Sequence, residues 1–482
     1  MKILHLTPEL APWSKAGGLG DAAAALAKQL AALGHEVRVA TPLYGSVPDR
    51  ERMGVALESL RVPVGGDAAR AACRVRKLAL APRCEAWFIE HEDFYGAREI
   101  YPHRADTAER AAFFGRAGLE ACLATGWIPD VVHCHDWTTG LVPVLLNTSL
   151  QDTPLGRAAS VLTIHNLQHQ GVLDRCVLDY LGLPAWLFQA HELECLGGVN
   201  FLKGGILHAT RVATVSPTYA REILTPEYGY GLDDVVRRRE RDLEGILNGV
   251  DTDDWDPRRD PNIARAFSAE DVSGKAACKA ALRRELELDE APGVPLVGVI
   301  SRLWEQKGLD LAARALPRFL RSGQLQFVLL GSGDAALENE YRRLAEVFRG
   351  RCAARIGYDN GLSHRIEAGA DFFLMPSRFE PCGLNQLYSM AYGTLPIVRA
   401  TGGLADTVKP WSPSARRGTG IVFHHADVGA IEWALEQAVA LYARPTDFAA
   451  AQQQAMREEF SWGQAAQAYV ACYQKAILQK QS

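Results

Sequence analysis

The chain has 482 residues, more than a single hydrophobic core can serve, so its length predicts two or three domains. With 48% hydrophobic and 23% charged residues, its composition is that of an ordinary globular protein. A formal net charge of −5 and a pI of about 6.3 provide no basic field, so neither nucleic acid nor an anionic membrane is expected as a partner.

Cysteine usage and the start of the chain indicate where the protein works. The ten cysteines are scattered without a CxxC pair, which is typical of free thiols in a reducing compartment. The first residues, MKILHLTPEL, contain too short an apolar run for a signal peptide, and no stretch reaches the ~18 apolar residues of a membrane span. The sequence therefore predicts a cytoplasmic protein.

The first half of the chain alternates short apolar runs with helix-length segments. An Ala/Leu-rich helix is expected over about 22–33, where Gly34 ends it. Buried strands are predicted at residues 3–6, 36–40, 86–89, 131–133, 161–164 and 211–215. Strands that alternate with helices indicate a parallel sheet covered on both faces.

The pattern changes after Asn248. The run NGVDTDDWDPRRDPN (248–262) is rich in Asp and Pro, lacks periodicity and is typical of a connection between domains. Strands resume at residues 295–300, 327–330, 354–356, 371–375 and 395–398, and an amphipathic helix is expected over about 462–478. The predicted fold class is α/β, with two doubly wound parallel-sheet domains whose ligand-binding loops follow the carboxyl ends of the strands.

Several strand ends in the first half carry side chains suited to a ligand. In KAGGLGD (15–21), glycines let the backbone approach a ligand and Lys15 can neutralise a phosphate, although such turns are common without a ligand. In HCHDW (133–137), two histidines on one strand face suggest a metal. No further ligand stands nearby at metal spacing, so substrate contact by Asp136 is favoured. His165, after the strand at 161–164, is either structural or a site residue.

Two loops of the second half are richer in chemistry. SRLWEQKG (301–308) directly follows a strand, and the fork of Arg302 with the ammonium of Lys307 can hold a diphosphate without a metal. The stretch 377–408, SRFEPCGLNQLYSMAYGTLPIVRATGGLADTV, places Glu380 and two helix N-termini after two strands. A carboxylate beside anion-binding N–H groups suits the transfer of a group from a phosphate leaving group.

A glycine-rich turn suggests a different function. GSGDAA (331–336) fits the pattern G-x-G-x-x-A, which would make the chain a dinucleotide-dependent oxidoreductase. No acidic residue ends a neighbouring strand at the expected offset of ~20 residues, and the turn does not open a domain. A tight strand–helix turn is the favoured interpretation.

Seven motifs in order resemble one family over nearly the whole chain. KAGGLGD (15–21), HDW (135–137), HN (165–166), NGVD (248–251), SRLWEQKG (301–308), FEPCGLNQLY (379–388) and TGGLADTV (401–408) are similar to the motifs of bacterial glycogen synthases and plant starch synthases. The resemblance implies a GT-B (glycosyltransferase B) fold, two Rossmann-like domains facing across a deep cleft. It implies an N-terminal acceptor domain (1–247), a C-terminal nucleotide-sugar domain (248–460) and a final helix (461–482) that crosses back to the first domain.

The same resemblance implies a reaction and its residues. Glucose would pass from ADP-glucose to the non-reducing 4-hydroxyl of an α-1,4-glucan such as glycogen, with retention of configuration. Lys15, Arg302 and Lys307 would stabilise the departing ADP, while Glu380 and His165 would act at the transferred glucose. The donor site would further include Gly17, Gly18, Asn248, Gly357, Tyr358 against the adenine, Cys382, Gly383, Leu384, Thr401, Gly402, Gly403 and Leu404, and the acceptor site Tyr95, Asp136 and Asp21. No metal or other cofactor is implied, because basic side chains neutralise the leaving group.

Two departures from the broader pattern and three alternatives remain. Ala16 stands where many relatives have Thr or Val, and Tyr388 stands where wider retaining relatives carry a second Glu. The same fold could use UDP-glucose or another acceptor, or belong to a non-catalytic glucan-binding protein. The presence of Lys15, Arg302, Lys307 and Glu380 together argues against the last alternative. The sequence does not indicate the oligomeric state.

Overall fold

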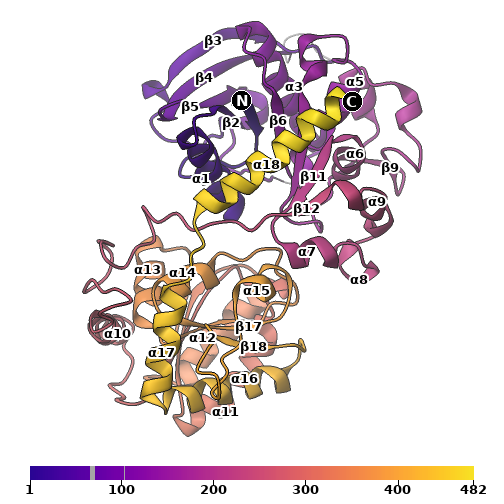
Figure 1. Cartoon of the computed structure of the whole chain (residues 1–482). Helices are drawn as coiled ribbons and strands as arrows, with labels where there is room; N and C mark the ends of the chain where they lie inside the picture. The colour runs from indigo at the N-terminus through magenta and orange to yellow at the C-terminus, as the bar shows by residue number, and fades with distance from the viewer. Residues whose placement is uncertain (66–70, 103) are drawn as a thin grey trace. The chain divides into compact units, whose positions relative to one another are not determined.

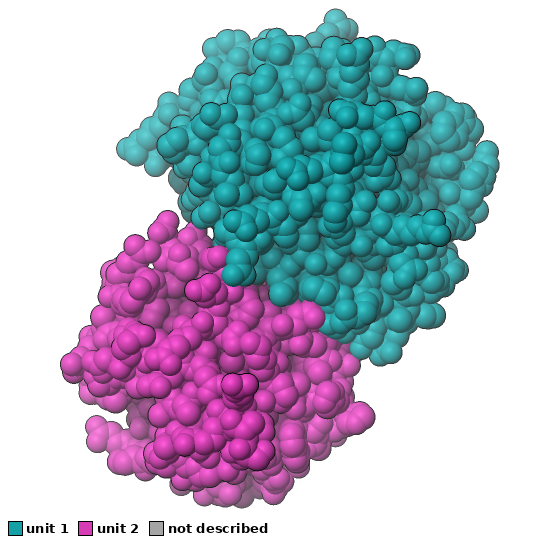
Figure 2. Space-filling model, viewed as in Figure 1, with its two compact units in different colours: residues 1–248, 462–482 teal, residues 249–461 magenta. Residues whose placement is uncertain are grey.

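The structure is a computed structural model that describes residues 1–65, 71–102 and 104–482. The chain divides into two compact units, residues 1–248 with 462–482 (unit 1) and residues 249–461 (unit 2), shown in teal and magenta in Figure 2. It therefore leaves unit 1 after Asn248, at the start of the Asp- and Pro-rich run, and returns after Ser461. Within the described ranges, no helix is long and apolar enough to cross a membrane.

Unit 1 is built on a nine-stranded sheet with the order β12-β11-β7-β6-β1-β2-β5-β4-β3. Neighbouring strands from β12 to β5 are parallel, whereas β4 and β3 extend the sheet in antiparallel fashion. The strands are β1 (Lys2–Leu6), β2 (Glu36–Pro42), β3 (Gly54–Arg61), β4 (Ala72–Ala81), β5 (Cys84–Glu90), β6 (Val131–His135), β7 (Ala159–Ile164), β11 (Arg211–Thr214) and β12 (Leu243–Gly245). The predicted parallel strands are confirmed, but β3, β4 and β12 were not predicted, since they are short or largely exposed.

Helices and a small second sheet complete unit 1. The helices are α1 (Gly18–Ala32), α2 (Glu92–Tyr95), α3 (Thr107–Thr125), α4 (Leu141–Asn147), α5 (Cys176–Leu181), α6 (Phe201–His208), α7 (Pro217–Glu222), α8 (Pro226–Gly229), α9 (Asp233–Arg238) and α18 (Trp462–Gln481). The second sheet contains β8 (Val172–Leu173), β9 (Glu194–Cys195) and β10 (Gly198–Asn200). Helix α1 begins four residues before the predicted start at about 22, because the glycine-rich segment forms its first turn and places Asp21 there, where the helix dipole favours a negative charge.

The C-terminal helix α18 packs on the sheet of unit 1. It contacts α1, β6 and β7, and Figure 1 shows it in yellow crossing the strands of this unit. Its buried residues recur at helical spacing and include Trp462, Tyr469 and Tyr473. The last helix of the chain thus covers part of a sheet that the first residues begin.

Unit 2 is a six-stranded parallel sheet with the order β15-β14-β13-β16-β17-β18. Its strands are β13 (Leu296–Ile300), β14 (Gln326–Gly331), β15 (Cys352–Ile356), β16 (Phe372–Met375), β17 (Leu395–Arg399) and β18 (Ile421–Phe423). Its helices are α10 (Gly274–Glu285), α11 (Leu309–Ser322), α12 (Ala335–Val347), α13 (Asn360–Gly369), α14 (Asn385–Ala391), α15 (Gly402–Thr407), α16 (Val428–Tyr442) and α17 (Pro445–Met456). The five strands predicted for this half are confirmed, and the strand order is that of a Rossmann-type sheet.

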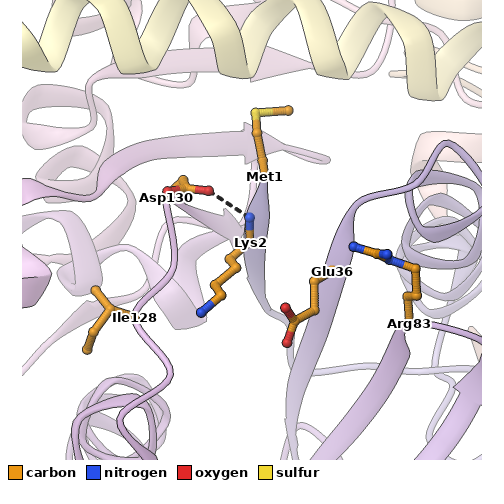
Figure 3. Close-up of a pocket in the computed structure, with 6 residues that line it drawn as sticks. All are labelled: Met1, Lys2, Glu36, Arg83, Ile128 and Asp130. Atoms are coloured by element: carbon orange, nitrogen blue, oxygen red, sulfur yellow. Dashed lines mark hydrogen bonds between the residues drawn. The ribbon is translucent and has the colours of Figure 1, made fainter.

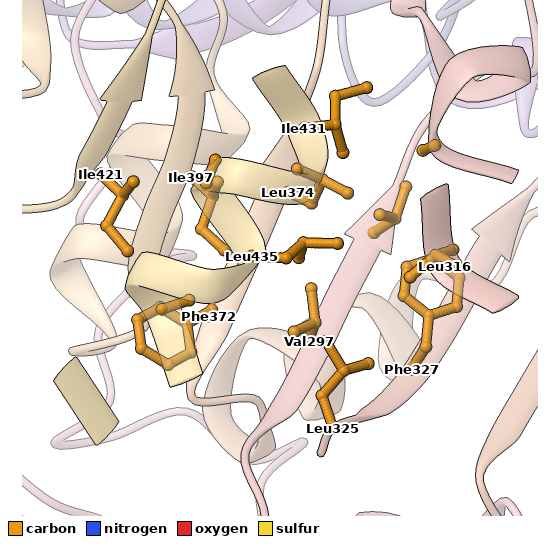
Figure 4. Packing of buried hydrophobic residues seen from close by; sticks show 14 of the residues in the cluster. Val297, Leu316, Leu325, Phe327, Phe372, Leu374, Ile397, Ile421, Ile431 and Leu435 are labelled. Carbon is orange, nitrogen blue, oxygen red and sulfur yellow. The ribbon is translucent and has the colours of Figure 1, made fainter. Parts of the chain in front are cut away.

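The core of unit 2 explains why its strands are continuous apolar runs. A parallel sheet covered on both faces buries successive side chains of each strand. Figure 4 shows Val297, Phe372 and Ile397 from three neighbouring strands packed against Leu316 of α11 and Leu435 of α16. All five side chains are fully buried. This packing fixes the carboxyl ends of the strands and the loops that follow them.

Each unit has one point at which the strand order reverses. In unit 2, β14 and β15 lie on one side of β13 while β16, β17 and β18 lie on the other. In unit 1, β2 lies on one side of β1 and β6 with β7 on the other. Loops leave these adjacent strands in opposite directions, so the carboxyl end of such a switch point is where open α/β sheets bind ligands.

Candidate functional site

Two of the loops predicted to bind a ligand meet at the switch point of unit 2. Lys307 follows β13 and Glu380 follows β16, and the Nζ of Lys307 lies 2.6 Å from Oε2 of Glu380. The hydroxyl of Ser377 donates a hydrogen bond of 3.0 Å to the same carboxylate oxygen. The Glu380 side chain is 7% exposed and that of Lys307 is 20% exposed. An ammonium group and a carboxylate are thus held together at the edge where a ligand is expected.

The backbone that carries Glu380 is tied to the loop that carries Lys307. The N–H of Arg378 donates to the carbonyl oxygen of Gln306 at 2.8 Å, and the guanidinium of Arg378 forms a two-bond pair with Asp310 at 2.7 and 2.8 Å. Gly308 has a φ of +64°, and a Cβ at this position would lie 2.0 Å from a backbone oxygen of the neighbouring loop. Only glycine therefore allows the two loops to approach so closely.

Two glycines fix the other side of the Glu380 loop. Gly402, at the start of α15, has a φ of +44°, and a Cβ there would lie 1.9 Å from the carbonyl oxygen of Glu380. A Cβ on Gly403 would lie 2.1 Å from the carbonyl oxygen of Cys382. The Gly-rich turn that the sequence suggested as an anion cradle is therefore also required for close packing.

The N–H groups of Gly403 and Leu404 already have partners in this turn. That of Gly403 donates to the carbonyl oxygens of Glu380 and Pro381 at 3.1 Å, and that of Leu404 donates to Thr401 at 3.1 Å. The family resemblance placed both residues in the donor site, where their N–H groups would face the diphosphate. Here they hold the Glu380 loop against α15, so an anion would have to replace these hydrogen bonds.

The other residues predicted for a donor site in unit 2 follow the ends of its strands. Arg302 follows β13 and is exposed, and its guanidinium makes no hydrogen bond or ion pair with any residue that the structure describes. Gly357 and Tyr358 follow β15, and Tyr358 is 78% exposed. Cys382 and Gly383 belong to the Glu380 loop, Leu384 is the N-cap of α14, and Thr401 is that of α15. The fold thus brings these residues to one edge of the sheet.

Tyr388, the departure from the wider pattern, has a packing role. Its ring stacks on Trp255 with centroids 4.1 Å apart and an interplanar angle of 3°. The opposite face of Trp255 stacks on His364 at 3.9 Å. Trp255 belongs to the Asp- and Pro-rich run after Asn248, so Tyr388 anchors this run to α14.

The GSGDAA turn (331–336) also has a packing explanation. A Cβ on Gly331 would lie 1.9 Å from the carbonyl oxygen of Ser301, and one on Gly333 would lie 2.6 Å from that of Leu303. The glycines therefore let the loops after β13 and β14 run against one another. Asp334 caps α12 through hydrogen bonds from two backbone N–H groups. These contacts favour the tight-turn interpretation over dinucleotide binding.

In unit 1, the loop after β1 is organised by a carboxylate that the sequence did not single out. Glu9 is buried, and its Oε2 accepts hydrogen bonds from the N–H groups of Ala16 and Gly17 at 2.7 and 2.9 Å. The hydroxyl of Tyr101 donates to its other oxygen at 2.8 Å. An acidic residue three positions after a predicted strand was the available signal. Glu9 fixes the turn that carries Lys15, which lies 2.8 Å from the carboxylate of Asp21 in an ion pair.

Asp136 and His165 directly follow the adjacent strands β6 and β7. Asp136 has a φ of +59°, unusual for a residue with a side chain, and its Oδ1 accepts hydrogen bonds from the N–H groups of His165 at 2.7 Å and Asn166 at 3.3 Å. Burial raises the pKa of Asp136 to about 7, although these two N–H groups lower it. Asp136 therefore shapes the backbone that follows β7.

Three histidines lie close enough in unit 1 to suggest a metal centre. His5 of β1 and His133 and His135 of β6 are fully buried, with ligand atoms within 4.8 Å of one another. His5 is bonded to His135, and His135 to His165, through pairs of ring nitrogens 3.0 and 2.9 Å apart. His133 is bonded to Thr163 and to Tyr473 of α18. Because nearly all these nitrogens already have partners, the donor set fits a hydrogen-bonded network better than a metal.

A hollow of about 630 Å³ lies beside this edge of unit 1. Aromatic side chains line it, among them Tyr44, Tyr95, Tyr101 and Trp137. Gly171 has a φ of +63°, and a Cβ there would lie 2.3 Å from the Trp137 ring. The hydroxyl of Tyr95 donates to the carbonyl oxygen of Arg110 at 2.7 Å, so Tyr95 offers the hollow its ring more than its hydroxyl. Flat aromatic walls of this kind suit the apolar faces of sugar rings.

A second hollow, of about 410 Å³, lies at the opposite edge of the same sheet (Figure 3). Its walls come from the starts of β1 and β2 and from the residues before β5 and β6: Met1, Lys2, Glu36, Arg83, Ile128 and Asp130. Positive and negative groups alternate around it, and the backbone N–H of Lys2 donates to Asp130 at 2.7 Å. None of the predicted site residues lies there.

Comparison with known proteins extends these observations over the whole chain. The family described as "Starch synthase catalytic domain" matches residues 2–238, and that described as "Glycosyl transferases group 1" matches residues 283–455. A glycogen synthase of Anaeromyxobacter sp. (strain Fw109-5) is 48% identical over 98% of this chain and 99% of its own length. A glycogen synthase of Myxococcus xanthus (strain DK1622) is 44% identical over 99% of this chain and all of its own length.

Solved structures give the same picture. The catalytic domain of starch synthase IV from Arabidopsis thaliana, bound to ADP and acarbose, is 34% identical with a TM-score of 0.91 and covers 99% of both chains. A sucrose-phosphate synthase from Thermosynechococcus elongatus, 19% identical with a TM-score of 0.62 and 98% coverage of both chains, shares the fold. The prediction of two Rossmann-like α/β domains of the glycosyltransferase B type is confirmed.

The raised pKa of Asp136 predicts a pH-dependent effect of Asp136→Asn. Burial raises this pKa from 3.8 to about 7, so the folded state holds the proton more tightly than the unfolded state. The resulting stabilisation is complete below pH 3.8 and is lost as the pH rises through about 7. Asn keeps an oxygen for the two N–H groups and carries no charge. The stability of the variant relative to the wild type should therefore be higher at pH 8 than at pH 5. Urea midpoints of both proteins at the two pH values measure this difference.

The exposed Asp152 in the same unit provides the control. Asp152→Asn should show the same difference from the wild type at both pH values. If Asp136→Asn behaved in that way too, the carboxyl of Asp136 would not have a raised pKa in the folded protein.

Proposed function

Since the chain belongs to the glycosyltransferase family of bacterial glycogen synthases and starch synthases, we propose that it transfers glucose from ADP-glucose to an α-1,4-glucan such as glycogen. The acceptor is the non-reducing 4-hydroxyl, and the configuration of the glucose is retained. The observation that carries the proposal is the 2.6 Å pair of Lys307 and Glu380 at the switch point of unit 2. A fixed cation beside a carboxylate is what the departure of a diphosphate from a sugar requires.

In this proposal unit 2 binds the nucleotide sugar. Lys307 and the exposed guanidinium of Arg302 neutralise the diphosphate, and the exposed ring of Tyr358, with Gly357 beside it, packs against the adenine. Support for an adenine nucleotide comes from the similar starch synthase IV, whose structure holds ADP. The other proposed donor contacts of this unit are Cys382, Gly383, Leu384, Thr401, Gly402, Gly403 and Leu404.

Lys307 has the central chemical role in the proposal. Negative charge grows on the departing phosphate as the bond to the sugar breaks, and Lys307 meets it as a cation already in place. Glu380 and the loop contacts around it restrict where that cation can lie, so little reorganisation is needed during the reaction. These basic groups do the neutralisation, so the proposal needs no metal or other cofactor.

Glu380 is proposed to position the transferred glucose rather than to attack it. Its Oε2 already accepts hydrogen bonds from Lys307 and Ser377, which weakens it as a nucleophile. Retention can proceed through a covalent intermediate or through departure and attack on one face of the sugar. Both routes need the same charge stabilisation by Lys307.

Unit 1 is proposed to bind the glucan and further groups of the donor. The aromatic hollow that Tyr95 helps to line would hold glucose units of the acceptor. Asp136 and Asp21 are the polar acceptor contacts of the proposal. Lys15, carried on the turn of Gly17 and Gly18, would contact phosphate. His165 would contact the transferred sugar, and Asn248, the residue after which the chain leaves unit 1, would contribute to the donor site. A cytoplasmic location of the protein stays a prediction from the cysteine pattern.

The direct test measures nucleoside diphosphate release from ADP-glucose and from UDP-glucose, each with and without glycogen. ADP release that depends on glycogen is expected, with much slower release of UDP. Faster release from UDP-glucose would overturn the assignment of ADP-glucose as the donor but would keep the assignment of a glucosyltransferase. The absence of release from both sugars, with glycogen still bound, would favour a non-catalytic glucan-binding protein.

A second prediction concerns Lys307→Ala. Removing this cation should lower kcat by about 100-fold or more, because its charge is needed mainly in the transition state. Glycogen binding should change little, since the change lies in unit 2. Lys409→Ala in the same unit is the matched control, because Lys409 also pairs with a glutamate, Glu458, but lies on the surface. Initial rates and a glycogen-binding assay provide the two readouts, and an unchanged kcat would contradict the role assigned to Lys307.

A further inference from the structure

We infer that a line of three histidines in unit 1, His5, His135 and His165, fixes the ring proton of His165 on Nδ1, so that this residue offers a hydrogen-bond donor to an oxygen of the bound sugar. In this view His135 and His5 are positioning residues that act through His165. The identity of the sugar rests on the proposed function. The position of the proton is a property of the chain itself and can be tested separately.

The line runs across three adjacent strands. His5 is on β1, His135 is the last residue of β6, and His165 follows β7. Nδ1 of His5 lies 3.0 Å from Nε2 of His135, and Nδ1 of His135 lies 2.9 Å from Nε2 of His165. His5 and His135 are 0% and 1% exposed, whereas His165 is half-buried at the carboxyl edge of the sheet. The line therefore connects the interior to the site edge.

The three rings are neutral near physiological pH. Burial lowers the pKa of His5 and of His165 to about 3 and that of His135 well below its usual value. A neutral imidazole has one N–H and one accepting nitrogen, so each bond in the line needs a donor at one end and an acceptor at the other. Only two arrangements satisfy both bonds: all protons point toward His5, or all point toward the site.

The inner end of the line decides between them. Nε2 of His5 is buried without a hydrogen-bond partner among the described residues. If the protons pointed inward, this atom would be a buried N–H with no acceptor, a condition that is rare in proteins. If the protons point outward, Nε2 of His5 is instead a buried acceptor without a donor. Unpaired buried acceptors are less rare than unpaired buried donors among backbone groups, and the same preference applies to this ring. The outward arrangement places the proton of His5 on Nδ1, that of His135 on Nδ1 and that of His165 on Nδ1.

The outer end of the line then has a defined chemistry. Nε2 of His165 is occupied by His135, and its Nδ1 makes no hydrogen bond with any residue in the described part of the chain. Nδ1 is thus the ring nitrogen left for a ligand, and it can donate but not accept. His165 would select an oxygen of the sugar that accepts a hydrogen bond in this position.

His133 provides an internal control. It lies on the same strand as His135 and pairs in register with His5, yet its ring nitrogens bond to Thr163 and Tyr473, each at 2.7 Å. It is fully buried like the others. Its ring lies against that of His135, with centroids 4.1 Å apart, but it shares no hydrogen bond with the line. Its removal should therefore disturb the contact with α18 and leave the direction of the protons unchanged.

The first test is histidine NMR of the full chain labelled with ¹⁵N-histidine. Long-range correlations between ring nitrogens and carbon-bound protons report which nitrogen carries the proton, and the His165 signals are identified by their absence in His165→Gln. The expected result is a proton on Nδ1 of His165 and none on Nε2. A proton on Nε2, or an even mixture, would overturn the inference. Metal-type shifts at His5 and His135 that a chelator abolishes would also overturn it, because coordination would replace their hydrogen bond.

The second test uses His5→Leu with His133→Leu as its control. His5→Leu removes the donor that orients His135, so His165 should populate both proton positions, and kcat should fall by about tenfold, the effect of one ordinary hydrogen bond. His133→Leu should lower the thermal midpoint but leave the His165 proton on Nδ1 and kcat within about twofold. Unchanged His165 signals in a folded His5→Leu variant would contradict the inference. If His5→Leu does not fold, the spectrum of the wild type still decides.

The two proposals fail in different ways. A wild-type protein that releases no nucleotide but holds the proton on Nδ1 of His165 would overturn the proposed function alone. An active transferase with the proton on Nε2 would overturn the histidine inference alone.

Discussion

The pair formed by Lys307 and Glu380 is the interaction on which the site of unit 2 depends. The two residues come from loops after β13 and β16, the strands between which the sheet order reverses, and their charged atoms lie 2.6 Å apart. Partly buried ion pairs often contribute little net stability, because both charges lose water. The surrounding contacts are better understood as positioning. Glycines at 308, 402 and 403 allow backbones to approach, and Arg378 with Asp310 ties the loops together, so the cation is in place before any charge develops.

In unit 1, hydrogen bonds rather than an ion pair position the site residues. Its site edge is shaped by Glu9, which holds the turn of Lys15, and by Asp136, which holds the backbone of His165. Behind them, histidines of β1 and β6 form hydrogen bonds beneath α18, where Tyr473 contacts His133. The final helix therefore covers the buried histidines on this face of the sheet. Burial lowers the pKa of His5 and His135, so their hydrogen bonds determine which ring nitrogen carries the proton and add no charge to the site.

The sequence predicted the features that depend on continuous apolar runs and on local turn chemistry. The parallel strands, the change of pattern at Asn248 and the side chains at strand ends such as Lys307 and Glu380 were all visible in this way. The antiparallel β3 and β4 were not, because their exposed positions give no apolar run. Contacts between residues far apart in sequence were also hidden. Nothing local indicates that His5 bonds to His135, 130 residues away, or that Glu9 would hold the N–H groups of Ala16 and Gly17. The expectation of anion contacts at Gly403 and Leu404 missed their backbone partners for the same reason.

The most direct test of the central claim follows the glucose rather than the nucleotide. ADP-glucose labelled with ¹³C at the anomeric carbon is incubated with a short α-1,4-glucan and the wild-type protein, and the products are examined by NMR. If Lys307 and Glu380 support a retaining transfer, the label appears in a new α-1,4 bond at the non-reducing end. Label in a β-linked product, or only in free glucose, would contradict the account.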